Sequence, residues 1–215
     1  MNARILALAA ALAAFARPPE ATAQTERLAG RLDERTRAAV EAIVDSVRGA
    51  GVPGDPLVNK ALEGASKGAD GARIVAAVRA LATNLARARA ALGAGATEPE
   101  LVAGAAALRA GASAVFLERL RADFPREPLV VPLAVMADLV ARGVQPDTAA
   151  QSVLTLVKAG VREADLVAFR QSVERDIALG APAGAAATAR AASAGGLATT
   201  GVPSIAGQTP HPRKP

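Results

Sequence analysis

The chain lacks most of the residue types from which catalytic and metal sites are built. Its 215 residues include no cysteine, tryptophan or tyrosine, and only one histidine. The absence of cysteine excludes disulfides, thiol nucleophiles and thiolate metal ligands. The histidine, His211, lies in a proline-rich stretch, so neither a Ser-His-Asp triad nor a histidine-based metal site is credible. We therefore expect no cofactor and no bound metal.

Aromatic residues and strand-forming patterns are also scarce. Aromatic residues make up 2% of the chain, and no stretch sustains the alternation of β-branched and polar residues that predicts a strand. The basic residues, which leave a net charge of +5, are scattered along the chain. Nucleic-acid-binding surfaces group their basic residues and often add aromatic side chains that stack on bases. We therefore expect no nucleic-acid partner.

What the chain does have is a recurring pair, a glycine followed by a small apolar residue, at the ends of helical patterns. The pairs are Gly51-Val52, Gly68-Ala69, Gly95-Ala96, Gly111-Ala112, Gly143-Val144, Gly160-Val161 and Gly180-Ala181. Glycine readily takes the left-handed conformation that ends a helix, and the next apolar residue folds back onto the last turn. The spacing predicts helical-hairpin repeats with a unit of about 16–17 residues.

The composition predicts an all-α fold, because alanine, leucine, arginine and glutamate favour helices. We expect an irregular bundle of short helices joined by Gly-[Val/Ala] turns, with a solenoid-like array as the alternative. The predicted helices cover residues 25–49, 56–66, 71–92, 98–110, 114–123, 129–140, 147–159 and 163–179. The segment 129–140 is apolar nearly all round, so we place it at the centre of the bundle.

Several of these helices begin with recognisable capping residues. Thr97 and Glu100 have the spacing of a capping box, in which each side chain binds the backbone N–H of the other residue. Asp70, Ser113 and Asp55 are candidate N-caps. Acidic residues in first turns are explained by capping and by the helix dipole, so they do not indicate catalytic carboxylates.

The first 23 residues have the features of a secretory signal peptide. Arg4 is followed by an uncharged apolar stretch from Ile5 to Ala16, and Ala21-Thr22-Ala23 fits a cleavage site after Ala23. A bilayer-spanning helix needs about 20 apolar residues, so we expect no membrane span in the mature form. The predicted location is the periplasm or the medium.

The remainder of the chain divides by composition into two parts. Residues 24–180 carry the helical pattern and are predicted to form one all-helical domain. Residues 181–215 are rich in alanine, glycine and proline and almost without large apolar side chains, so we predict a disordered tail, with residues 181–194 marginally helical at best.

One polar cluster is a candidate binding site. Asn59, Lys60, Glu63 and Lys67 lie on one short predicted helix and its end, and the spacing of the last three places them on one face. The simplest interpretation is an exposed ladder of ion pairs. The functional interpretation is a contact patch for a protein partner or for an anionic envelope ligand.

These observations favour a non-catalytic interaction or scaffold module of the bacterial cell envelope rather than an enzyme. Its partner would be an unknown protein or an envelope component. The first alternative is an envelope-binding protein whose positive charge attracts anionic lipid or a cell-wall polymer. The others are a small-molecule carrier with a cavity beside residues 129–140, and a hydrolase that uses carboxylates alone.

Overall fold

The structure is a computed structural model that describes residues 26–200, with side chains described as far as residue 196. The predicted signal peptide, residues 1–23, and the predicted tail beyond residue 200 lie outside the described residues. Between residues 26 and 200 every regular element is a helix and none is a strand. The prediction of an all-α fold is confirmed.

The helices follow one another with short connections. They are α2 (Glu34–Arg48), α3 (Asp55–Ser66), α4 (Gly71–Leu92), α5 (Glu98–Ala110), α6 (Ala114–Asp123), α7 (Val130–Ala141), α8 (Pro146–Lys158), α9 (Glu163–Ala178) and α10 (Ala183–Thr200). From α3 to α9, the predicted boundaries differ from the observed ones by at most one residue.

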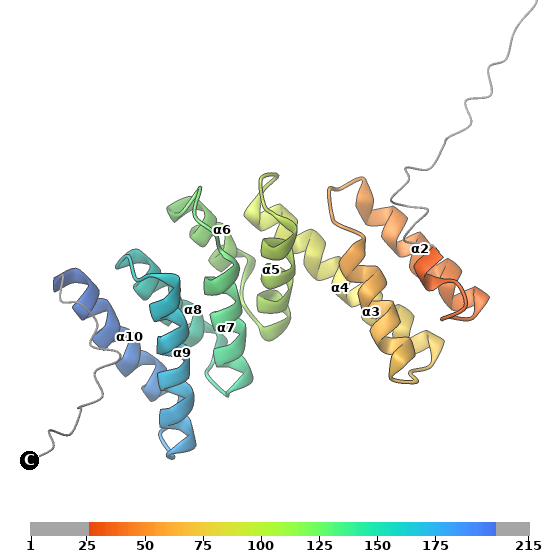
Figure 1. Cartoon of the computed structure of the whole chain (residues 1–215). Coiled ribbons are helices and arrows are strands. Elements are labelled where there is room, and N and C mark those ends of the chain that lie inside the picture. The colour runs from red at the N-terminus through yellow and green to blue at the C-terminus, as the bar shows by residue number, and fades with distance from the viewer. Residues whose placement is uncertain (1–25, 201–215) are drawn as a thin grey trace, which may run out of the picture.

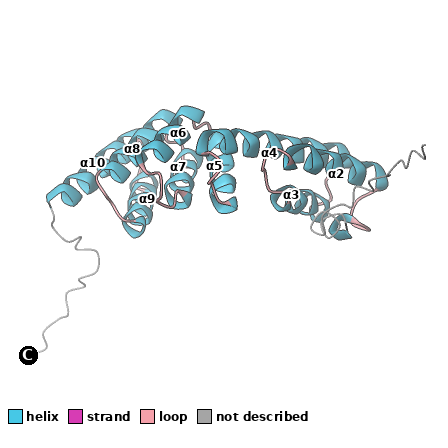
Figure 2. Cartoon of the chain, turned by 90° about the horizontal axis from the view of Figure 1, so that it is seen from above, coloured by secondary structure: helices cyan, strands magenta, loops and turns pink. Residues whose placement is uncertain are grey.

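The helices form an elongated two-layered bundle in which they lie side by side in a row (Figure 1). Seen from above, α2, α4, α6, α8 and α10 form one layer, and α3, α5, α7 and α9 form the other (Figure 2). The contacts stay local along the row. For example, α4 packs against α2, α3, α5 and α6, while α7 packs against α5, α8 and α9. The two ends of the described chain therefore lie at opposite ends of the molecule (Figure 1).

Six of the seven predicted glycine turns are confirmed. Positive φ angles occur at Gly51, Gly68, Gly111, Gly143, Gly160 and Gly180. After each of these glycines, the next residue donates its N–H to the carbonyl five residues earlier, as Val144 does to Leu139 at 3.0 Å. The prediction at Gly95 is wrong. Because α4 ends at Leu92, the adjacent Gly93 is the residue that leaves the helix with φ 81°.

The predicted helix starts agree with the structure except at one residue. The structure confirms the capping box of Thr97 and Glu100 and the N-caps Asp70 and Ser113. Asp55 is the first residue of α3 rather than its N-cap, which is Gly54. The proline that follows Asp55 is tolerated in the first turn, where its missing N–H has no helical partner, so the helix begins one residue earlier than expected.

The predicted long helix 25–49 is interrupted. Residues 26–28 form one helical turn, Gly30 takes a φ of 71°, and α2 begins only at Glu34. Asp33 causes the restart, because its carboxylate accepts hydrogen bonds from the backbone N–H of Thr36 at 3.0 Å and from its hydroxyl at 2.6 Å. An aspartate that binds backbone in this way favours a cap over a helix interior.

The predicted disorder of residues 181–215 is wrong for the part that the structure describes. Residues 183–200 form α10, which packs against α8 and α9. Ala186, Ala187 and Ala191 are buried in that contact, and Arg190 binds Asp176 through two hydrogen bonds of 2.7 and 2.8 Å. Alanine has the highest helix propensity, and its small side chain lets helices approach closely, so large apolar residues were not needed here.

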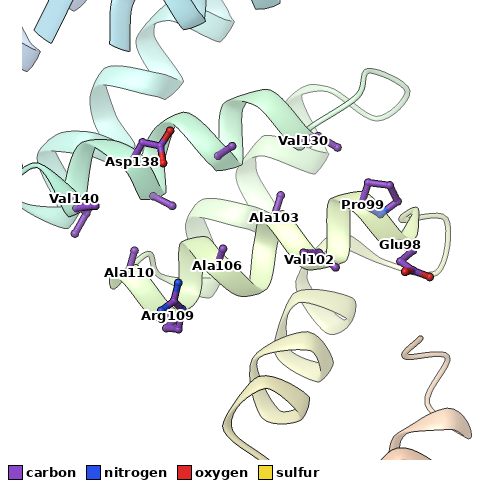
Figure 3. Close-up of a pocket in the computed structure, with 13 residues that line it drawn as sticks. Glu98, Pro99, Val102, Ala103, Ala106, Arg109, Ala110, Val130, Asp138 and Val140 are labelled. Carbon is purple, nitrogen blue, oxygen red and sulfur yellow. The ribbon is translucent and has the colours of Figure 1, made fainter. Parts of the chain in front are cut away.

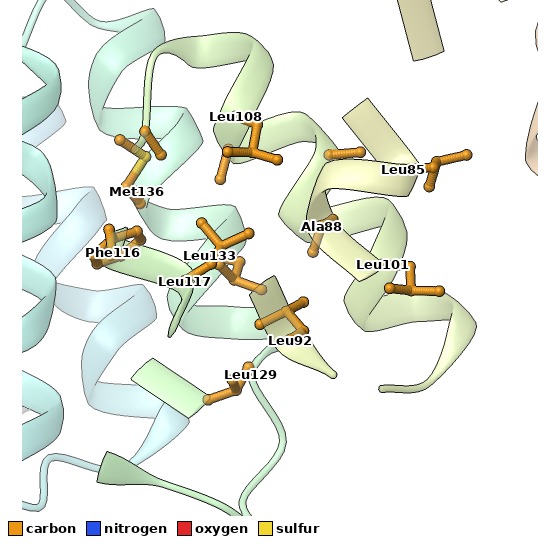
Figure 4. Close-up of a cluster of buried hydrophobic side chains, with 14 of the residues drawn as sticks. Leu85, Ala88, Leu92, Leu101, Leu108, Phe116, Leu117, Leu129, Leu133 and Met136 are labelled. Carbon is orange, nitrogen blue, oxygen red and sulfur yellow. The ribbon is translucent and has the colours of Figure 1, made fainter. Parts of the chain in front are cut away.

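The core runs the length of the row and includes one face of α7. Leu129, Leu133, Met136 and Leu139 have no solvent exposure. Figure 4 shows Leu133 and Met136 among leucines of α4, α5 and α6. The expectation that residues 129–140 lie at the centre is confirmed for this face only. Ala134, on the opposite face of α7, is exposed.

Replacing Gly143 with alanine is expected to lower the free energy of unfolding by about 1–2 kcal/mol, because an L-residue resists the left-handed conformation. Gly143 has a φ of 89°, and an added Cβ would meet no atom within 4 Å, so the cost is purely conformational. Gly49→Ala is the matched control, since Gly49 also ends a helix with free space around it but has a φ of −61°. Urea denaturation of both variants checks the difference, and equal stabilities would contradict it.

Candidate functional site

The structure brings together three of the four residues of the predicted polar patch. Glu63 on α3 binds the ammonium groups of both Lys60, at 2.9 Å, and Lys67, at 2.5 Å. The three side chains are between 40% and 69% exposed. They form the ladder of ion pairs that the spacing predicted, and its two positive charges share one carboxylate.

Asn59 belongs to a different contact. Its side-chain oxygen accepts a hydrogen bond from the guanidinium of Arg27, which also pairs with Asp55 at 3.0 Å. Asn59 therefore helps to join the first described turn to α3 and takes no part in the ladder. Whether the patch binds a ligand stays a prediction.

The ladder has one measurable electrostatic consequence. Hydrogen bonds from Lys67 and Lys60 lower the pKa of Glu63 to about 2. Because the folded-state pKa lies below that of the unfolded chain, the ion pairs stabilise the fold above the unfolded-state pKa. That contribution is lost as the pH falls through about 2.

In a carboxyl-resolved NMR titration, we expect Glu63 to titrate near pH 2. In the Lys60→Gln, Lys67→Gln double variant, its midpoint should rise toward the usual value for glutamate, about 4.3. Exposed ion pairs contribute little to folding, so the thermal midpoint at neutral pH should scarcely change. A Glu63 midpoint that is the same in both proteins would contradict the ion pairing.

Glu100 is the one buried acidic residue among those that the structure describes, with 5% exposure. Its carboxylate accepts hydrogen bonds from the backbone N–H groups of Thr97, at 2.9 Å, and Leu129, at 3.1 Å, and from Arg121 at 2.6 Å. Burial raises the pKa of Glu100, but these hydrogen bonds outweigh it, so the pKa lies below the usual value.

Arg121 extends this network into the connection between α6 and α7. Its second terminal nitrogen lies 3.2–3.4 Å from the backbone carbonyls of Phe124, Pro125 and Glu127. The two side chains thus tie α5, α6 and the connection before α7 together. Because the buried Glu100 carboxylate already accepts hydrogen bonds from Thr97, Leu129 and Arg121, this network is structural. Sequence reasoning assigned Glu100 only to capping, since nothing local reveals a partner 21 residues away.

An open apolar surface feature lies between α5 and α7. It is a groove of about 960 Å³, which we call the α5–α7 groove. Its apolar lining includes Pro99, Val102, Ala106, Val130, Ala134 and Ala141. Val102 is 40% exposed, an unusual exposure for a large apolar side chain in this fold. Charged side chains also line the groove, namely Glu98, Arg109 and Asp138.

The groove results from the direction of the helices and the size of their side chains. In Figure 3, Glu98 and Val130 lie at one end of the groove and Arg109 and Val140 at the other, so α5 and α7 run in the same direction. Their outer faces carry mostly alanine, and such short side chains leave a channel between the two helices. Sequence reasoning missed it because alanines on a predicted helix indicate helix propensity rather than a surface.

The described residues supply little for other kinds of site. They contain no group of three or more histidine, cysteine, aspartate or glutamate side chains that could hold a metal ion. Within the same range, no helix has both the length and the hydrophobicity required to cross a membrane. Comparisons with protein-family models, with curated proteins and with solved structures found no match to the chain.

Proposed function

We propose that this protein is a non-catalytic interaction module that binds a helical protein segment in the α5–α7 groove. The observation that carries the proposal is the groove itself, an open apolar channel with charged groups along it. A partner helix that buries its apolar face in a groove between helices is a recurrent mode of recognition. The signal-peptide pattern of residues 1–23 supports a place for this module in the bacterial cell envelope.

The size of the groove suits a short helix. Its α5 wall runs from Glu98 to Ala110, which corresponds to about 18 Å at 1.5 Å per residue. A helix of about three turns would match that length, with large apolar side chains three or four residues apart resting on the alanines. The apolar floor offers no converging polar groups of the kind that orient a small molecule, so a protein segment fits better than a carried ligand.

The charge distribution gives less support to binding of an anionic polymer or lipid. The two lysines of the polar patch already share Glu63. Arg37 is flanked by Glu34 and Glu41, and Arg170 by Asp138 and Glu174. Such pairing lowers the positive potential that these basic groups offer to an anionic surface.

A photo-crosslinking amino acid at Val102 tests the proposal in cells. The same amino acid at Val115 is the matched control, because Val115 is 52% exposed but lies on α6, outside the groove. We expect the probe at Val102 to give one defined protein adduct, and the probe at Val115 to give none. Ala106→Arg, which places a charge on the apolar floor, should abolish the adduct.

The other outcomes contradict separate parts of the proposal. Adducts only with lipid or carbohydrate, or no adduct at either position, would exclude a protein-binding groove. A defined adduct recovered only with cytosolic proteins would leave the groove intact but would contradict export.

A further inference from the structure

We infer that the face bearing the α5–α7 groove docks against the same face of a second copy of this chain, with the two α5 helices antiparallel across a two-fold axis. This inference rests on the proposed function of this face in protein binding and names the partner. It is carried by two exposed charges of opposite sign, Glu98 and Arg109, which lie at opposite ends of the same helix face (Figure 3).

Both charges are available to a partner. Neither Glu98 nor Arg109 forms an ion pair or a side-chain hydrogen bond with another described residue, and both are exposed. Asp138, at the Arg109 end of the groove, does not neutralise Arg109, because its carboxylate binds Arg170 at 3.2 Å. The two free charges are 11 residues apart, about 16 Å along the helix.

A two-fold axis fixes which charges meet. If the axis lies in the plane of the face and perpendicular to α5, each α5 runs antiparallel to the other. Glu98 of each copy then lies opposite the partner's Arg109, and both pairs form at once, as an isologous interface requires. An axis parallel to α5 would instead bring like charges together, which is unfavourable. The charges therefore select the antiparallel arrangement.

The apolar part of the face is compatible with the same register. The midpoint between the two charges falls between Ala103 and Gly104, close to the centre of the groove wall. Val102 then lies beside the partner's Ala106, so that a larger side chain meets a smaller one on both sides of the axis. Small residues at such a crossing allow the two helix backbones to approach closely.

Charge exchange between copies tests the arrangement. Glu98→Lys and Arg109→Glu each turn both intermolecular pairs into repulsive contacts, so each variant should self-associate about tenfold more weakly than the original protein. A 1:1 mixture of the two variants can form a heterodimer. In it, the unchanged Arg109 of the Glu98→Lys copy meets the unchanged Glu98 of the Arg109→Glu copy. The lysine introduced at position 98 meets the glutamate introduced at position 109, so both pairs are attractive. The mixture should regain the original affinity as a heterodimer, measured by sedimentation equilibrium of the protein recovered from expressing cells.

Two further measurements sharpen the result. Arg119→Glu is the matched control, because Arg119 is an exposed arginine on α6 outside the groove, and it should leave self-association unchanged. Raising the salt to 0.5 M should reduce the differences between the variants, because exposed charges are then screened within a few ångströms.

Three outcomes would overturn the inference: an original protein that stays monomeric at about 100 μM, single variants that dimerise as well as the original, or a mixture that fails to recover. The proposed function fails separately. If the probe at Val102 still captures one different protein while the original chain is monomeric, the groove binds a foreign helix and only self-docking is wrong.

Discussion

Replacing Glu100 with alanine is expected to lower the free energy of unfolding by about 3 kcal/mol. The change removes the acceptor for Arg121 and for the backbone N–H of Leu129, both of which would stay largely inside the protein. A buried ion pair that loses one member leaves an uncompensated charge, and this costs far more than the intact pair contributes. Chemical denaturation by urea, followed by circular dichroism, measures the loss.

Glu118→Ala provides the control for this experiment. Glu118 is exposed on α6, and changes at such positions usually shift stability by less than about 0.5 kcal/mol. The pH dependence gives a second readout. Because hydrogen bonds lower the pKa of Glu100 in the folded state, its contribution is complete above the unfolded-state pKa and declines as the pH falls through the folded-state pKa. A Glu100→Ala variant as stable as the control would show that the network does not hold the connection.

Replacing Gly71 with alanine is expected to destabilise the protein by about 2 kcal/mol, opposite in sign to the usual gain from this change in a helix. A Cβ at Gly71 would lie 2.0 Å from the hydroxyl oxygen of Thr36. That hydroxyl is held by Asp33 at 2.6 Å, so it cannot move without loosening the cap of α2. The start of α4 packs against the start of α2 only because Gly71 has no side chain.

Two companion variants separate the steric clash of the added methyl group from the effect of alanine on helix propensity. Gly184→Ala places a methyl group in α10 where no atom lies within 4 Å, so it should be neutral or slightly stabilising. Thr36→Ala combined with Gly71→Ala removes the clashing hydroxyl and should recover part of the loss seen in Gly71→Ala. Thermal unfolding of the four proteins compares them, and a Gly71→Ala variant more stable than the original would refute the close approach.

The helix boundaries between α3 and α9 were predictable because each is marked by local chemistry. Asp70, Ser113 and the pair Thr97 and Glu100 satisfy backbone N–H groups within three residues of themselves. The break before α2 was missed because the cap at Asp33 lies inside a stretch whose apolar pattern continues across it. Residues 183–200 were missed because their order comes from packing on α8 and α9, which composition does not reveal.

The candidate sites also include one that local sequence predicted and one that depends on packing between helices. The ladder of Lys60, Glu63 and Lys67 was predictable from spacing on one helix. The α5–α7 groove was not, because its walls are two helices separated by α6 and its shape depends on which alanines face outward. Spacing along α3 did not predict the contact of Asn59, because its partner Arg27 lies 32 residues away in the sequence.

The local character of the contacts along the row determines how quickly the chain can fold. Each helix packs chiefly against helices one or two places away in sequence, so few contacts require distant segments to find each other. Folding rates of small domains rise as the sequence separation of contacting residues falls, because less entropy is lost in closing loops before contacts form. A chain of this design is therefore expected to fold faster than a chain of the same length whose contacts join distant segments.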